Sequence, residues 1–155
     1  MNDRVNMEKA FSVLSEFYEE KLPFNKLLGI KMEEFSLEKA VVSLQMKEEL
    51  VGNSEMQILH GGVIASVLDF TGGVVAHLSV IKQMKGAPLA EIGQRLIQVG
   101  TIDMRVDYIR PGRGNVFKAT GEVLRLGNKV AVTRCELHND DDVLIAAATG
   151  TYLVG

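Results

Sequence analysis

The sequence is poor in cysteine, in tryptophan and in net positive charge. Cys135 is the one cysteine among 155 residues, so no disulfide can form within the chain, which is typical of a reducing compartment. The formal net charge of −3 argues against nucleic acid as the main partner. Because Cys135 falls inside an expected strand, we interpret it as a packing residue and not as a nucleophile.

Long apolar runs are also missing. The most hydrophobic segment is interrupted by Asp69 and by four glycines, so no stretch of about twenty apolar residues could span a bilayer without a break. Residues 1–9 are polar and charged, unlike the start of a secretory signal peptide. We therefore expect a cytoplasmic protein that does not bind a membrane.

The length and the hydrophobic content fit one domain that covers residues 1–155. Hydrophobic residues make up 46% of the chain, enough for a sizeable core and for a surface that another subunit covers. Residues 7–21 place Phe11, Leu14 and Phe17 among charges, which predicts an amphipathic helix in an N-terminal segment 1–22 that ends before Pro23.

The chain is organised around residues 60–78, which have helical length and almost no polar side chain. Apolar residues recur at steps of three or four, so this helix is expected to be buried on most sides. Asp69 is the one formal charge between His60 and Lys82. Burying an ionised carboxylate costs several kcal/mol unless it is paired or hydrogen-bonded. We therefore predict that Asp69 is a functional group or belongs to a structural network.

Gly61 and Gly62 fall in the first turn of that helix. The first backbone N–H groups of a helix lack internal partners, and the helix dipole makes this end positive. Since glycine has no side chain to block a ligand, these N–H groups could bind a developing oxyanion, with Asp69 about two turns further along. A tight turn from loop to helix is the alternative interpretation of the two glycines.

The rest of the chain is predicted to be mostly sheet. Alternating apolar residues indicate strands over residues 27–35 and 38–47, and a polar loop over 48–57 leads to the central helix. Residues 82–99 are predicted to be a loop. Further strands are expected over residues 101–108, 116–126, 129–138 and 143–154, and residues 102, 104, 106 and 108 are expected to face the core. This order predicts an α+β domain in which an antiparallel sheet wraps around one helix.

This architecture and three motifs resemble the hotdog-fold acyl-CoA thioesterases, in the PaaI-like branch and its small bacterial members of the YigI type. The motifs are His60-Gly61-Gly62 followed by six residues and Asp69, then residues 106–112, which end in Pro-Gly, and residues 146–152. The similarity extends from about residue 24 to residue 154. It implies a hotdog fold and hydrolysis of medium- to long-chain fatty acyl-CoA to free acid and coenzyme A.

The resemblance also implies roles for individual residues. Asp69 matches the acid that serves as general base for water or as a nucleophile, and Gly61 matches the donor to the thioester carbonyl. His60 matches the residue before that donor, and we expect it to fix the loop by a hydrogen bond, with a role as a base as the alternative. Asn53 matches an asparagine that orients the thioester or water, although it stands one residue further from the histidine than in the usual pattern, so Ser54 or Gln57 are alternatives. Thr101 matches a residue that places the water.

Coenzyme A enters as part of the substrate, and neither a further cofactor nor a metal is expected. Gly62 and the basic residues near two turns, Arg110, Arg113, Arg125 and Lys129, are candidates for binding it, because guanidinium and ammonium groups bind phosphates. Ordinary surface charges are the alternative. The resemblance implies sites assembled across a homodimer, or across a dimer of dimers.

Three alternatives stay open at this stage. The substrate could be an aryl or phenylacetyl-type acyl-CoA. The protein could be a hotdog enoyl-CoA hydratase, although hydratases carry a different loop before the helix. It could also be an acyl-CoA binding module without catalysis, although such modules usually carry a DNA-binding segment.

Overall fold

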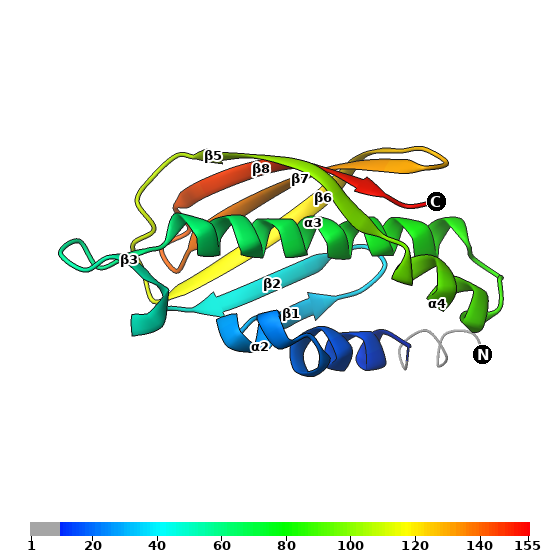
Figure 1. Cartoon of the computed structure of the whole chain (residues 1–155), viewed down its shortest axis with the longest axis horizontal. Coiled ribbons are helices and arrows are strands. Elements are labelled where there is room, and N and C mark those ends of the chain that lie inside the picture. The colour runs from blue at the N-terminus through cyan, green and yellow to red at the C-terminus, as the bar shows by residue number, and fades with distance from the viewer. Residues whose placement is uncertain (1–9) are drawn as a thin grey trace.

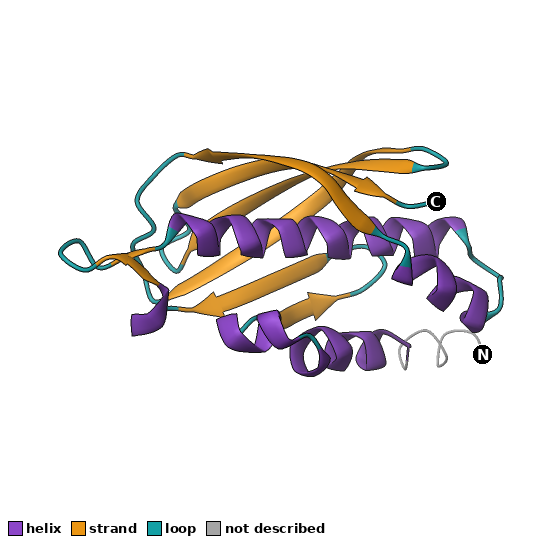
Figure 2. Ribbon diagram, viewed as in Figure 1, coloured by secondary structure: helices purple, strands orange, loops and turns teal. Residues whose placement is uncertain are grey.

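Six antiparallel strands curve around one long helix in the computed structural model, which describes residues 10–155 (Figure 1). Across the sheet the strands are β1 (Lys31–Phe35), β2 (Ala40–Gln45), β6 (Val116–Leu126), β7 (Val130–Asn139), β8 (Leu144–Leu153) and β5 (Gly100–Tyr108). The helices gather on one side of this sheet, as Figure 2 shows. The predicted α+β class, with an antiparallel sheet around a central helix, is confirmed.

The central helix α3 (Gly61–Gln83) lies along the concave face of the sheet. His60 caps its first turn, because its Nδ1 accepts a hydrogen bond of 2.8 Å from the N–H of Gly62. Leu68 is fully buried and packs with Leu44 and Phe117 of the sheet, so the helix forms the centre of the core. By length and composition α3 could also cross a membrane, but 67% of its most apolar window is buried inside the protein.

The segment before the sheet is helical over a longer range than the sequence suggests. Residues 10–16 are helical and continue into the π-helical turn η1 (Phe17–Lys21), while residues 7–9 of the predicted helix lie outside the described part. A further helix, α2 (Pro23–Leu28), follows, so the strand predicted over residues 27–35 is wrong at its start. Pro23 supplies the first helical turn, and Gly29 ends the helix at φ 79°, a left-handed conformation that glycine adopts at low cost.

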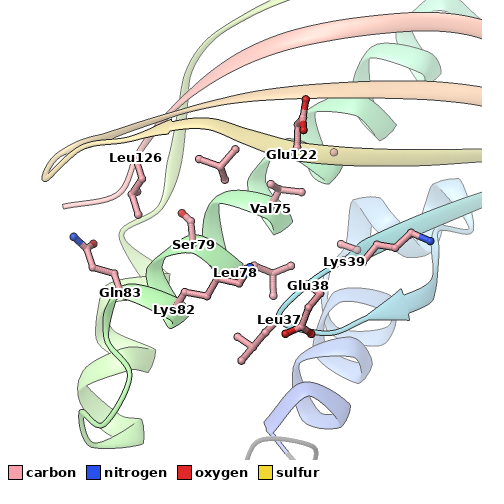
Figure 3. Close-up of a pocket in the computed structure, with 13 residues that line it drawn as sticks. Leu37, Glu38, Lys39, Val75, Leu78, Ser79, Lys82, Gln83, Glu122 and Leu126 are labelled. Carbon is pink, nitrogen blue, oxygen red and sulfur yellow. The ribbon is translucent and has the colours of Figure 1, made fainter.

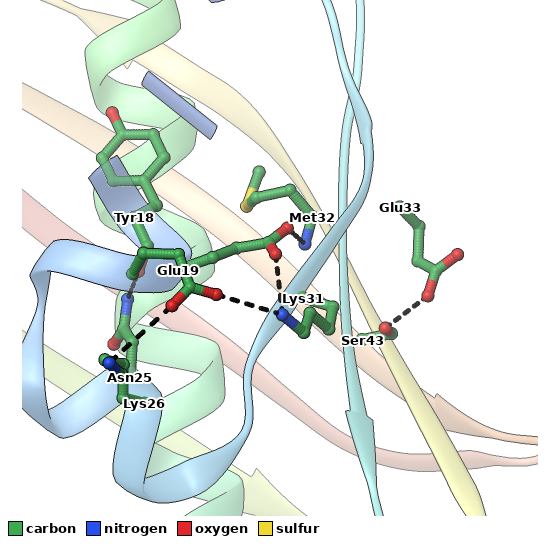
Figure 4. A network of polar contacts seen from close by, with 9 residues as sticks. Tyr18, Glu19, Asn25, Lys26, Lys31, Met32, Glu33 and Ser43 are labelled. Carbon is green, nitrogen blue, oxygen red and sulfur yellow. Dashed lines mark hydrogen bonds and ion pairs between the residues drawn. The ribbon is translucent and has the colours of Figure 1, made fainter. Parts of the chain in front are cut away.

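A set of polar contacts ties η1 to the first strand (Figure 4). The Glu19 carboxylate accepts hydrogen bonds from Lys31 Nζ at 2.9 Å and from the N–H of Met32 at 2.8 Å. The Asn25 amide donates to the carbonyl oxygen of Tyr18 at 2.9 Å. These contacts hold η1 against β1 and α2, and Phe17 and Tyr18 of η1 line one side of a cavity described below.

Residues 82–99 contain a helix, α4 (Leu89–Ile97), where the sequence predicted a loop. Pro88 precedes its first turn, and Ile92 and Leu96 are the apolar residues at helical spacing that face the core. The single turn between these two positions contains Gly93, which weakens the helical signal in the sequence. α4 packs beside α3 (Figure 1).

The outer strand β5 is more exposed than predicted. Met104 and Val106 pack against the core, but 55% of Ile102 and 56% of Tyr108 are exposed. The register shifts between Thr101 and Asp103, so Ile102 is an extra residue in a bulge and leaves the core-facing series. β5 also has a neighbour on one side only, β8, among the described strands.

The remaining expected strands are confirmed in type and place. Residues 116–126, 130–139 and 144–153 form the meander β6–β7–β8, with turns at residues 127–129 and 140–143. The expected polar loop over residues 48–57 holds the short turn η2 (Glu48–Leu50) and strand β3 (Val51–Asn53), which pairs with β4 (Ile58–Leu59). This hairpin directly precedes the start of α3.

Candidate active site

Asp69 lies at the centre of a small group of hydroxyls. Thr101 Oγ1 donates to Asp69 Oδ1 at 2.9 Å, and the Tyr152 hydroxyl lies 3.1 Å from the same oxygen. The Asp69 side chain is half-buried, and no cation of residues 10–155 forms an ion pair with it. Within the described part of the chain, the carboxylate is therefore held by neutral hydroxyl groups and not by an ion pair.

The sheet register brings the two hydroxyls together. Thr101 is the second residue of β5 and Tyr152 is the second-last residue of β8, and the two are direct partners across the antiparallel pair. Asp69 projects from the third turn of α3 toward this pair. The structure thus unites Asp69 and Thr101, two of the predicted catalytic residues, although their roles in catalysis stay predictions.

A mainly apolar cavity of about 630 Å³ adjoins Asp69. Its walls come from the N-terminal helical segment, α3, α4 and the start of β5. Asp69, Thr101 and Tyr152 contribute the polar atoms at one part of the wall, and the apolar lining includes Phe17, Leu22, Phe70, Val74, Leu96, Ile97 and Val99. Such a volume is ordinary for the binding site of a small molecule, and its lining suits an aliphatic chain.

A neutral histidine closes part of this cavity. Tyr18 of η1 donates to His77 Nδ1 at 2.6 Å, and His77 Nε2 lies 3.2 Å from the carbonyl oxygen of Leu96. Burial lowers the pKa of His77 to about 4, so the ring is neutral near pH 7, with its proton on Nε2 toward Leu96. Because these three residues come from η1, α3 and α4, their contacts join the three walls of the cavity.

The N-terminus of α3 is a second site with polar groups that a ligand could contact. The N–H of Gly62 is used by the cap to His60, whereas none of residues 10–155 accepts a hydrogen bond from the N–H of Gly61. The Tyr108 hydroxyl donates to the carbonyl oxygen of Gly61 at 3.0 Å. His60 therefore caps the helix start, and the Gly61 N–H remains available for a ligand. A cavity of about 320 Å³, lined in part by His60 and Gly62, lies alongside.

The structure does not bring Gly61 and Asp69 together within one chain. Asp69 follows Gly61 by eight positions along the helix, a distance of about 12 Å along the axis. Asn53 is the last residue of β3, where the turn to β4 begins, and it forms no hydrogen bond with Asp69. Its side-chain oxygen accepts the N–H groups of Glu55 and Met56 at 3.1 and 2.9 Å, so it stabilises its own turn. Ser54 and Gln57 lie in the same exposed turn.

The predicted coenzyme A contacts fall into two separate groups. Arg110 and Arg113 precede β6 near the start of α3, where they donate to the carbonyl oxygens of Leu144 and Met56. Arg125 and Lys129 flank the turn at the other end of β6, which has 11 residues and is roughly 35 Å long. One nucleotide therefore cannot contact both groups within a single chain.

The remaining candidates for chemistry lie elsewhere. A cavity of about 590 Å³ lies between α3, β6 and the β1–β2 turn. Charged side chains such as Lys82 and Glu122 line it together with apolar ones (Figure 3), but no predicted site residue does.

In residues 10–155 no three His, Cys, Asp or Glu side chains lie close enough together to form a metal site. Burial raises the pKa of the Cys135 thiol to about 12, which fits its interpretation as a packing residue.

Comparison with known proteins identifies the family. Residues 56–146, which include the start of α3, Asp69 and Thr101, match the Thioesterase superfamily. The chain belongs to this superfamily. Its relatives include the medium/long-chain acyl-CoA thioesterase YigI of Salmonella typhimurium, 46% identical, and that of Escherichia coli, 45% identical, each aligned over the full length of both chains.

Solved structures agree with this assignment. A crystal structure from Shewanella oneidensis, described as related to the thioesterase superfamily, is similar with a TM-score of 0.92 and 45% identity, over 96% of this chain and 97% of the other. The resemblance to thioesterases drawn from the sequence motifs is thus confirmed. Tyr152, within the motif at residues 146–152, is a polar neighbour of Asp69 that the sequence does not single out, because its contact depends on the β5–β8 register.

Proposed function

We propose that this thioesterase hydrolyses medium- to long-chain fatty acyl-CoA to free fatty acid and coenzyme A. The observation that carries the proposal is a half-buried carboxylate, held by two hydroxyls, in the wall of a mainly apolar cavity. An acyl chain would fill the cavity and place its thioester carbonyl near Asp69. The relatives with 45–46% identity over the full chain, which carry the name of this activity, support the same substrate class.

In the proposed reaction Asp69 accepts a proton from water while the water oxygen bonds to the carbonyl carbon of the thioester. In the alternative route a carboxylate oxygen of Asp69 attacks that carbon and gives a mixed anhydride, which water then hydrolyses. The C–S bond breaks, and coenzyme A leaves as a thiolate that is stable near neutral pH. A positioned base contributes about 10²–10⁴-fold to the rate. Thr101 donates to Oδ1 and so helps to orient the carboxylate.

The two hydroxyls beside Asp69 are engaged with its Oδ1, so the oxyanion of this reaction needs another donor. We propose that the N–H of Gly61 from a second subunit supplies it, since the two groups of one chain are about 12 Å apart. A backbone donor to an oxyanion contributes about 10²–10³-fold. The exposed apolar side chains of β5, Ile102 and Tyr108, support a homodimer, or a dimer of dimers, that covers this strand.

Arg110 and Arg113 are the basic pair that we propose for the phosphates of coenzyme A, because they lie near the start of α3. Arg125 and Lys129, at the far end of β6, are then surface charges. We expect the reaction to need no cofactor besides the substrate. A cytoplasmic location remains our proposal, on the ground of the single cysteine.

The test is a thiol-release assay over a series of acyl-CoA chain lengths, with phenylacetyl-CoA and an enoyl-CoA as comparison substrates. We expect kcat/KM to rise with chain length through the medium and long range. Hydration of the enoyl-CoA with no thiol release would indicate a hydratase. Binding without turnover would indicate an acyl-CoA binding module, and preference for phenylacetyl-CoA would indicate an aryl substrate. Solution scattering should give a dimer or larger; an active monomer would contradict the shared site.

A further inference from the structure

We propose that Tyr152 is a positioning residue for the thioesterase reaction: together with Thr101 it holds Asp69 Oδ1 and so directs Oδ2 toward the reacting carbon. This inference rests on the proposed function, in which Asp69 is the base or nucleophile. Both hydroxyls contact Oδ1, and no hydrogen bond reaches Oδ2 from the described part of the chain. Oδ1 is therefore the oxygen that fixes the carboxylate in place, and Oδ2 is the oxygen that reacts in this proposal.

The Tyr152 hydroxyl restrains Asp69 at two points. It lies 2.9 Å from the carbonyl oxygen of Asp69 and 3.1 Å from Oδ1 of the same residue. One hydroxyl proton shared between these two oxygens ties the side chain to its own backbone and thereby restricts its rotamer. Thr101 donates to Oδ1 from the neighbouring strand, so the side chain is fixed from α3, β5 and β8 together.

Two glycines, Gly72 and Gly150, make the space that the ring of Tyr152 occupies. Only 1% of Tyr152 is exposed. A Cβ added at Gly72 of α3 would lie 2.8 Å from the ring carbon Cζ, and one added at Gly150 of β8 would lie 2.7 Å from Cε2. Both distances are far below van der Waals contact, so any larger residue at either position would displace the ring. These two glycines allow the hydroxyl to reach Asp69.

The Tyr152 hydroxyl keeps its proton and therefore always acts as a hydrogen-bond donor to Asp69. Burial, and after it the charge of Asp69, raise the pKa of Tyr152 above its ordinary value, so the phenol keeps its proton throughout the pH range of the reaction. A phenylalanine would fill the same space without placing a polar group in the core. Within residues 10–155, both oxygen atoms that accept a hydrogen bond from this hydroxyl belong to Asp69, which links the hydroxyl to the carboxylate.

The experiment compares Tyr152→Phe with the wild-type protein in the thiol-release assay and in the Asp69→Asn background. We expect kcat of Tyr152→Phe to fall by about 10- to 100-fold, because a small misplacement of a reacting group costs that much, with KM within about twofold of the wild-type value. In the Asp69→Asn background the same change should cause no further loss, because its effect passes through the carboxylate. Thr151→Val, which removes a hydroxyl from the opposite face of β8, is the matched control and should retain wild-type kcat.

The outcomes separate the inference from the proposed function. A wild-type protein that releases no thiol from any acyl-CoA would overturn both. An active wild-type protein with a fully active Tyr152→Phe would overturn the inference alone. An equal loss in the wild-type and Asp69→Asn backgrounds would also overturn it, since that result would mean that Tyr152 acts on the fold. Thermal unfolding of each variant verifies that the domain is intact.

Discussion

Filling the cavity from α4 should shorten the acyl chains that the enzyme accepts. Gly93 lines the cavity, and a Cβ added there meets no heavy atom within 4 Å, so a larger side chain can enter the open volume. We consider Gly93→Leu. The change favours the helix by about 0.8 kcal/mol, so the variant should fold. Each methylene group that the leucine displaces forfeits about 0.8 kcal/mol of burial, a factor of about four in kcat/KM.

Displacement of two to three methylene groups therefore predicts a loss of about 15- to 60-fold in kcat/KM for the longest substrates. Substrates too short to reach α4 should keep their wild-type values. The assay is thiol release across the chain-length series, and Gln94→Leu, which adds the same side chain at an exposed position of α4, is the control. Unchanged long-chain activity, or an equal loss at every chain length, would refute the assignment of the cavity to the acyl chain.

Two further predictions follow from buried titratable groups. Because burial lowers the pKa of His77 to about 4, the unfolded chain binds a proton between pH 6.5 and 4 that the folded protein does not. The free energy of unfolding should therefore fall by up to about 3 kcal/mol as pH falls through this window. Urea denaturation should show this loss in the wild-type protein but not in His77→Gln. The same loss in the variant would contradict the prediction. Because burial raises the pKa of Cys135 to about 12, a thiol reagent at pH 8 should modify it only after unfolding, and rapid labelling of the native protein would oppose the packing role.

The features that could be predicted from the sequence are those with local causes. Asp69 stands out because no other formal charge falls between His60 and Lys82, and the helix start is marked by two glycines after a capping histidine. The β6–β7–β8 meander follows from alternating apolar residues and short polar turns. Each of these signals lies within a few residues of the element that it specifies.

The features that were missed depend on contacts between distant segments. The bulge at Ile102 is a matter of pairing between β5 and β8, and it moves this residue out of the alternating series. Tyr152 reaches Asp69 from 83 residues away, and its ring has room to do so because Gly72 and Gly150 carry no side chain. α4 left a local signal in Pro88, Ile92 and Leu96, but Gly93 obscured it, and its apolar face becomes clear only against α3.

The most direct test of the account is the turnover of Asp69→Asn. Asparagine keeps the size of the side chain and can still accept the hydrogen bond from Thr101, but it neither accepts a proton nor attacks a thioester. We predict a loss of at least about 100-fold in kcat on a long-chain acyl-CoA, with an unchanged thermal unfolding transition and retained substrate binding. A folded Asp69→Asn protein that releases thiol at the wild-type rate would contradict the central claim that this carboxylate performs the hydrolysis.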